Sequence, residues 1–248
     1  MQARKGIGRR LVLAAGAGSL AACAPVPEPR RHRAVEETRR SAQPAPGDVE
    51  DWNRGLLEAA DAGDADEAAR LLGLGAEVEV RDGEGRGPLM LAALADRVET
   101  ARVLVAYCAD PDARDDLGDT PWVTCGVTGS VAMMQAILAA GPDLEVPNRR
   151  GGSPLHPAAE RGHADYVREV LAATDIARVV DRVNYNGWTA LLEAVALGDG
   201  GEPHQEIVAM LLDAGADAAI RDRDGRTALD HARERGYGVI RDLLENVR

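Results

Sequence analysis

Short apolar runs recur along the chain in pairs, separated by polar and glycine-containing segments. The first run of each pair lies in a phrase that begins at a glycine and occurs five times, as GRGPLMLAA, GDTPWVTCG, GGSPLHPAA, GWTALLEAV and GRTALDHAR. The second run follows later and ends in one of four similar sequences, LLGLGAE, LVAYCAD, ILAAGPD and LLDAGAD. Gly85, Gly118 and Gly151 are 33 residues apart, and Gly187 and Gly225 follow after 36 and 38 residues. Each period predicts two helices, a turn between them and an extended loop.

The residues at the ends of the runs support two helices per period. A hydroxyl suited to capping a first helix stands at Thr120, Ser153, Thr189 and Thr227. Proline follows the cap position at residues 88, 121 and 154, where a missing N–H costs nothing. Glycines at 63, 129, 162, 198 and 236 mark the turn between the helices, and those at 75, 141 and 215 end the second helix with a positive φ.

These phrases resemble the ankyrin repeat, and the resemblance covers residues 48–248. It implies an all-α solenoid in which helix-turn-helix units are joined by β-hairpin-like loops, each unit being stable only when stacked. We expect six repeats, at residues 49–81, 82–114, 115–147, 148–183, 184–221 and 222–248. The first lacks the recurring phrase, so we expect it to be the N-terminal cap, with Trp52 covering the open end.

The stretch SPLHPAAERGH, residues 153–163, raises the question of a catalytic or metal site. In the other periods the position of His156 holds Met90, Val123, Leu192 and Asp230, so its histidine is one variant of a packing position. The resemblance implies that a histidine here braces loops by hydrogen bonds. The spacing matches no zinc motif, and no nucleotide loop or nucleophile–base pair occurs. We therefore expect no catalytic residues, no metal and no cofactor.

Repeats four and five depart from the regular period. Pro157 lies inside a predicted helix and should distort it locally. Repeat four has three extra residues within TDIARVVDRVN, and repeat five has five extra within LGDGGEPHQEIV. Such insertions are either drift at tolerant positions or loops that carry function. His204, in the second insertion, is expected to be exposed, and we assign it no role.

Charge limits the class of partner. The net charge is −12, and residues 1–47 carry nine basic and three acidic residues, so residues 48–248 carry −18. This acidic domain argues against nucleic-acid binding. Apolar residues make up 45% of the chain without any phenylalanine, which suits closely stacked helices with small side chains.

The N-terminus predicts export. Basic residues precede the uncharged run LVLAAGAGSLAA, which is too short to span a bilayer. Leu20 to Cys23 resembles the lipobox of bacterial lipoproteins, which implies a signal peptide at residues 1–22 and lipidation of Cys23. The alternative is an ordinary secretory signal with a cysteine near the cleavage site by chance. Because Ala24 rather than Asp follows the cysteine, the resemblance implies a periplasmic-side anchor in the outer rather than the inner membrane.

Residues 23–47 form a proline- and arginine-rich segment with almost no large apolar side chains. It predicts a disordered tether, which is either solvated or in contact with anionic headgroups.

The leading functional hypothesis is a lipid-anchored, monomeric scaffold that binds a protein partner. The resemblance implies binding through the loop tips, where we select Asp116, Asp119, Arg149, Arg150, Tyr185, Asn186, Trp188, Arg223 and Asp224. Tyr185 and Trp188 are the expected anchors, although Trp188 has packing on a neighbouring loop as an alternative. A second hypothesis is an accessory or immunity factor that regulates a periplasmic or secreted enzyme, for example in antioxidant support. The repeat positions of Cys108 and Cys125 are too far apart for a disulfide, so we expect two free thiols.

Overall fold

The computed structural model describes residues 46–246. The predicted signal peptide, Cys23 and almost all of the tether lie outside the described residues. The described part holds no strand, and its helices are α1 (Pro46–Ala62), α2 (Ala65–Leu74), α3 (Pro88–Leu94), α4 (Val98–Ala106), α5 (Pro121–Thr128), α6 (Val131–Leu138), α7 (Leu155–Arg161), α8 (Ala164–Ala173), the 3₁₀ helix η2 (Ile176–Val179), α9 (Ala190–Ala196), α10 (Glu202–Asp213), α11 (Ala228–Arg235) and α12 (Gly238–Glu245). The predicted all-α class is confirmed. None of these helices is long and apolar enough to cross a membrane.

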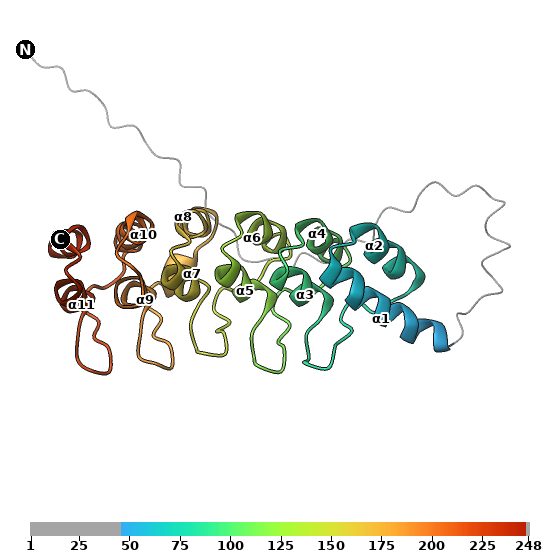
Figure 1. The fold of residues 1–248 in the computed structure, drawn as a ribbon. Coiled ribbons are helices and arrows are strands. Elements are labelled where there is room, and N and C mark those ends of the chain that lie inside the picture. The colour runs from blue at the N-terminus through green and yellow to red at the C-terminus, as the bar shows by residue number, and fades with distance from the viewer. Residues whose placement is uncertain (1–45, 247–248) are drawn as a thin grey trace, which may run out of the picture. The chain divides into compact units, whose positions relative to one another are not determined.

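The helices of the repeat array form two layers (Figure 1). The first helices of successive pairs, α1, α3, α5, α7, α9 and α11, contact one another in order, and the second helices, α2 to α12, do the same. The loops between pairs project side by side from the layer of first helices. One continuous core of small and aliphatic side chains runs between the layers, which is the arrangement expected of a solenoid.

Three of the four predicted helix caps are confirmed. The hydroxyl oxygens of Thr120, Thr189 and Thr227 each accept a hydrogen bond, at 3.2 Å, from the backbone N–H three residues later. In α11 the cap is reciprocal, because Asp230 Oδ2 accepts from the N–H of Thr227 at 2.9 Å.

The prediction that Ser153 caps a helix is wrong, because Pro157 changes the first turn of α7. Pro157 has no N–H to pair with the Ser153 carbonyl, and the N–H of His156 takes that oxygen instead, at 3.1 Å. The next helical bond, from Ala158 N to Pro154 O, is stretched to 3.4 Å. As a result α7 begins at Leu155, one residue later than the proline that opens α3 or α5. The local distortion expected at Pro157 is confirmed.

The distorted turn of α7 lies against a glycine of the preceding repeat. A Cβ atom placed on Gly126, in α5, would stand 2.1 Å from the carbonyl oxygen of Pro154. The other periods have Ala93, Ala159, Val195 and Arg233 at this position. Glycine is therefore required here by the close approach of two backbones rather than by its own φ angle.

Positive φ angles occur where turns and helix ends were predicted, but at three of these places the residue is not the predicted glycine. Gly63, Gly129, Gly162 and Gly236 have φ between 70° and 87°. Asp96, at φ 53°, takes the turn position of repeat two, and Gly200 rather than Gly198 takes it in repeat five because the insertion shifts the turn. Cys108, at φ 67°, occupies the position where Gly75 and Gly141 end their second helices.

A side chain at the N-cap or in the first turn of a second helix commonly bonds to the preceding repeat, and we call this contact an inter-repeat strap. The acceptor is a backbone carbonyl oxygen near the end of the preceding first helix. The four straps join Arg97 Nε to Asp61 O at 3.0 Å, His163 Nε2 to Val127 O at 3.2 Å, His204 Nε2 to Glu160 O at 3.2 Å and Tyr237 Oη to Gly198 O at 3.0 Å.

The strap at His204 shows that the prediction of an exposed histidine is wrong. The histidine is buried rather than exposed, and its Nδ1 lies 2.9 Å from Asp199 Oδ1. The extra residues of repeat five therefore place a histidine in the first turn of α10, from which its ring reaches α7. The extra residues of repeat four form η2, whose Ile176 is buried in the core.

Candidate protein-binding surface

All five loops close with the same five-residue turn. The first residue of the turn is Asp or Asn, and its Oδ1 accepts hydrogen bonds from the backbone N–H groups of the third and fifth residues. The backbone N–H of the first residue also donates to the carbonyl of the fifth. The turns are residues 82–86, 115–119, 148–152, 184–188 and 222–226, and we call the loops that carry them loops two to six, after the repeats that they begin. The fourth residue is the recurring glycine, at φ between 71° and 89°.

Hydrogen bonds also tie each loop to the next. The N–H of Asp116 donates to Glu84 O at 3.1 Å, and the N–H of Tyr185 donates to Arg150 O at 2.7 Å. Arg149 donates its N–H to Asp119 Oδ1 at 3.0 Å, and its side chain forms an ion pair with Asp119 at 3.3 Å. The last loop joins through a hydrogen bond from the Arg223 guanidinium to Tyr185 O. Most of the predicted binding residues thus lie on one connected row of loops.

The predicted binding residues differ in their access to solvent. Asp119 and Trp188 are half-buried, whereas the exposed members are Asp116, Arg149, Arg150, Tyr185, Asn186, Arg223 and Asp224. Tyr185 is 66% exposed, the largest exposed fraction among the exposed large hydrophobic side chains of the described residues. Its ring lies over Gly151, where a Cβ would come within 2.7 Å of it. Tyr185 is therefore both accessible and held against the neighbouring loop.

Trp188 packs inside the array. Its ring contacts the core, and its centroid lies 6.2 Å from that of His231, with the planes tilted by 53°. The carbonyl of Trp188 accepts a hydrogen bond from His156 Nε2 at 3.2 Å. These contacts support the packing alternative for Trp188, while its contribution to partner binding stays a prediction.

His156 braces the base of loop five. Its Nδ1 accepts from the N–H of Ser153 at 3.1 Å, so the proton lies on Nε2, which faces Arg182 O at 3.1 Å and Trp188 O. Burial lowers the pKa of His156 to about 4. The ring is therefore neutral and fully engaged, which agrees with its expected role as a brace for the loops.

A small polar cleft lies between loops three to five and the first helices. It has a volume of about 90 Å³ and is lined by Asp119, Val127, Asn148, Arg149, Arg150, His156, Pro157, Glu160, Arg161, Asn184 and Glu193. Glu193 is only 4% exposed, and its Oε1 accepts from Asn184 Nδ2 at 2.7 Å. Burial, and then the like charge of Glu160, raise the pKa of Glu193 to about 7.

The turn-closing Asp and Asn residues and Glu193 were not among the residues predicted from the sequence. The first set has a clear signal, because Asp or Asn always stands three residues before the recurring glycine. Glu193 gives none, because its importance comes from burial beneath a loop.

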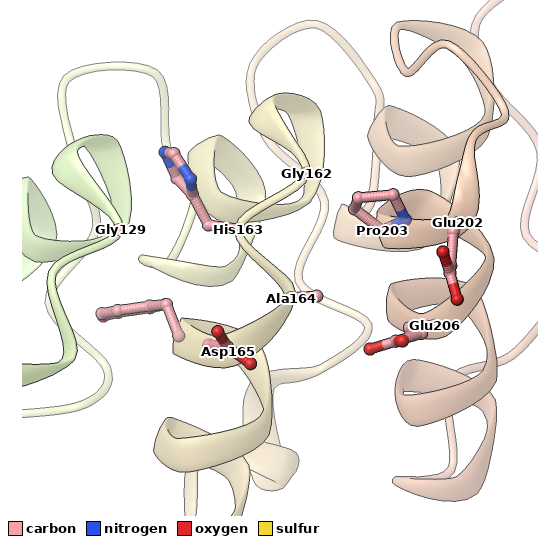
Figure 2. Close-up of a pocket in the computed structure, with 9 residues that line it drawn as sticks. Gly129, Gly162, His163, Ala164, Asp165, Glu202, Pro203 and Glu206 are labelled. Carbon is pink, nitrogen blue, oxygen red and sulfur yellow. The ribbon is translucent and has the colours of Figure 1, made fainter.

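A larger cavity, of about 410 Å³, opens between the starts of α8 and α10 (Figure 2). Its lining includes His163, Asp165, Glu202 and Glu206. Three of these side chains are already engaged, because His163 forms a strap and both Asp165 and Glu206 form ion pairs with Arg168, at 2.5 and 2.6 Å. Across residues 46–246 no group of three or more His, Cys, Asp or Glu side chains is placed to hold a metal ion.

The cysteines follow the prediction only in part. Cys125 is a buried free thiol, and burial raises its pKa above the ordinary range. It therefore forms no bridge to Cys108, as expected from their repeat positions. The sulfur of Cys108 is in a disulfide, so the prediction that both cysteines are free thiols is wrong for this residue.

The fold and its row of loops define an ankyrin repeat protein. The family model described as ankyrin repeats in three copies matches residues 56–148 and 124–222, and the chain belongs to this family. The chain is 38% identical over 188 residues to the ankyrin repeat protein YahD of Escherichia coli (strain K12). That match covers 76% of this chain and 92% of YahD.

Two solved structures are similar over most of their length. An ankyrin repeat domain from Acinetobacter baumannii AYE is 41% identical with a TM-score of 0.71, covering 77% of this chain and 95% of that domain. The ankyrin repeat protein EF0377 is 37% identical with a TM-score of 0.74, covering 79% and 98%. A 94-residue stretch is also 39% identical to the NAD-capped RNA hydrolase NUDT12 of Homo sapiens, but it covers only 19% of that enzyme.

Proposed function

We propose that this protein is a non-enzymatic, monomeric scaffold, exported and held in the bacterial cell envelope by lipid on Cys23, that binds a protein partner through its loops. The observation that best supports binding through the loops is the exposed ring of Tyr185, which lies on a loop with little freedom to move. Loop five is closed by its own turn, bonded to loop four through Tyr185 N, and braced from below by His156. A rigid, exposed aromatic side chain loses little entropy on binding, which favours it as an anchor.

Arginines surround this anchor. Arg149 and Arg150 precede it on loop four, and Arg223 lies beside it on loop six. A central aromatic residue with a charged, solvated rim is the usual composition of a protein interface. The lipid anchor and export are supported by the N-terminal sequence, with its basic start, apolar run and Cys23.

Replacing Tyr185 with alanine is expected to lower partner affinity about thirtyfold, which corresponds to about 2 kcal/mol, with little loss of stability. The backbone contacts of Tyr185 do not depend on its ring, so the loop should keep its conformation. The partner would be isolated with the full-length chain and its affinity measured by calorimetric titration. Tyr107→Ala is the matched control, because that tyrosine is exposed at the end of α4, away from the loops. Equal affinities for both variants and the wild type would exclude Tyr185 as an anchor.

Replacing Cys23 with alanine is expected to move the protein from the membrane fraction to the soluble fraction. The mature wild-type protein should begin at Cys23 and carry the mass of a diacylglycerol, as measured by intact-mass spectrometry. Cys125→Ala serves as the control, since it removes a free buried thiol instead and leaves Cys23 in place. An unmodified N-terminus elsewhere in the chain would refute the anchor.

A further inference from the structure

Two loops have a polar pair beneath them that the other loops lack. The first residue of each turn is followed nine positions later by a residue of the next first helix. In loop five these residues are Asn184 and Glu193, bonded at 2.7 Å. In loop six they are Asp222 and His231, also at 2.7 Å, with the donor now on the helix. The equivalent helix residues under the other loops are Leu91, Thr124 and Pro157.

Glu193 stabilises the orientation of the Asn184 amide that closes the turn. The Oδ1 atom of Asn184 closes the turn by accepting from the N–H groups of Asn186 at 2.9 Å and Trp188 at 3.1 Å. An amide has nearly the same shape when its oxygen and nitrogen are exchanged, but the exchanged form would direct N–H groups at N–H groups. Because Glu193 accepts from Nδ2, it stabilises the one orientation that keeps the turn closed.

We propose that Glu193 is a positioning residue for partner binding, which acts through Asn184 to hold loop five in the conformation that presents Tyr185. The inference rests on the proposed function, in which Tyr185 is the anchor. It adds that the geometry of the anchor is set by a buried carboxyl group that the partner need not touch. Loop four gives an internal comparison, because Asn148 closes the same turn above Pro157, whose side chain has no atom that can accept a hydrogen bond from it.

The surroundings of Glu193 make this contact sensitive to protons. Helix α7 contributes His156, Glu160 and Arg161 to the cleft, loop four contributes Arg149 and Arg150, and loop three contributes Asp119. Helix α11, packed on the other side of α9, carries His231 in its pair with Asp222. With a pKa of about 7, Glu193 changes charge near neutral pH. The ionised form accepts the Asn184 hydrogen bond more strongly, so loop five should become better ordered as pH rises.

The test follows the amide and side-chain NMR signals of the ¹⁵N-labelled full-length protein from pH 5.5 to 8.5. We expect the Asn184 Nδ2 signal and the Asn186 and Trp188 amides to shift together, with a midpoint near pH 7. The Arg150 and Gly152 amides, which form the same turn in loop four, should show a change at least threefold smaller. In Glu193→Gln, which keeps an acceptor but cannot ionise, the shared inflection should disappear while the turn stays closed.

Two results would overturn the proposal. One is the absence of a shared inflection in the wild type, and the other is its persistence in Glu193→Gln, which would assign it to another group such as His231. With the partner available, Glu193→Ala should weaken binding about tenfold, and Glu193→Gln should keep the affinity within twofold but remove its pH dependence. Loss of binding in Tyr185→Ala together with unchanged binding in Glu193→Ala would refute only this inference, whereas unchanged binding in Tyr185→Ala would refute the proposed function.

Discussion

Replacing Gly126 with alanine is expected to lower the free energy of unfolding of the repeat array by about 3 kcal/mol. The new methyl group would lie 2.1 Å from the Pro154 carbonyl oxygen, a main-chain atom at the N-terminus of α7 that cannot turn aside like a side chain. Repeats three and four would have to move apart, which would open the core between α5 and α7. Urea unfolding followed by circular dichroism measures the change.

The control is Gly238→Ala, at the first position of α12, where a Cβ would meet nothing within 4 Å. This variant should change stability by less than about 1 kcal/mol. A second variant tests the cause of the close approach. If Pro157 displaces the Pro154 carbonyl toward α5, then Pro157→Leu should reduce the cost of Gly126→Ala in a double-mutant cycle. Equal stability losses in Gly126→Ala and Gly238→Ala would show that the two repeats can separate without cost.

Substitution of Glu193 or His156 by glutamine should reveal opposite pH dependences of stability that offset each other in the wild type. The pKa of Glu193 is raised from 4.5 to about 7 by burial, so its contribution to stability is complete below pH 4.5 and is lost as pH rises to 7. The pKa of His156 is lowered from 6.5 to about 4 by burial, so its contribution is complete above pH 6.5 and is lost as pH falls to 4. Each shift corresponds to about 3 kcal/mol.

Between pH 4.5 and 6.5 the two contributions have opposite slopes. Relative to the wild type, Glu193→Gln should lose about 2–3 kcal/mol of stability as pH falls through this range, and His156→Gln should lose a similar amount as pH rises through it. Urea unfolding at several pH values provides the data, and subtracting the wild-type curve removes the contributions common to all three proteins. Parallel curves for all three would mean that neither group changes its pKa on folding.

The periodic features of the fold were predictable because each depends on local chemistry. A hydroxyl before a proline, a glycine at a turn and an apolar run each have a structural cause within a few residues, and repetition made those causes visible. The failures occurred where a proline changes the bonding of its own helix turn or where a contact between repeats decides the structure. Ser153 has the right chemistry for a cap, but Pro157 alters the bonding of its helix turn. His204 was predicted to be exposed in a loop, but the insertion places its ring within hydrogen-bond distance of a main-chain carbonyl oxygen of α7.

The candidate surface was predictable in location but not in its internal roles. Family resemblance placed the binding residues on the loop tips, where the structure finds most of them exposed. It could not distinguish Tyr185 from Trp188, because both are aromatic and lie three residues apart. The difference comes from tertiary packing, since His231 of the next repeat lies near the Trp188 ring and leaves Tyr185 uncovered. Glu193 was not predicted for the same reason, because its burial also depends on tertiary packing.

The inter-repeat straps affect how freely the sequence can diverge. Their donors are arginine, histidine and tyrosine side chains of very different shape, but every acceptor is a main-chain oxygen. A mutation cannot delete a main-chain oxygen, so each repeat always offers half of the contact to its neighbour. A strap can therefore be lost and regained through several different codons, and a duplicated repeat finds an acceptor already in place wherever it is inserted in the array.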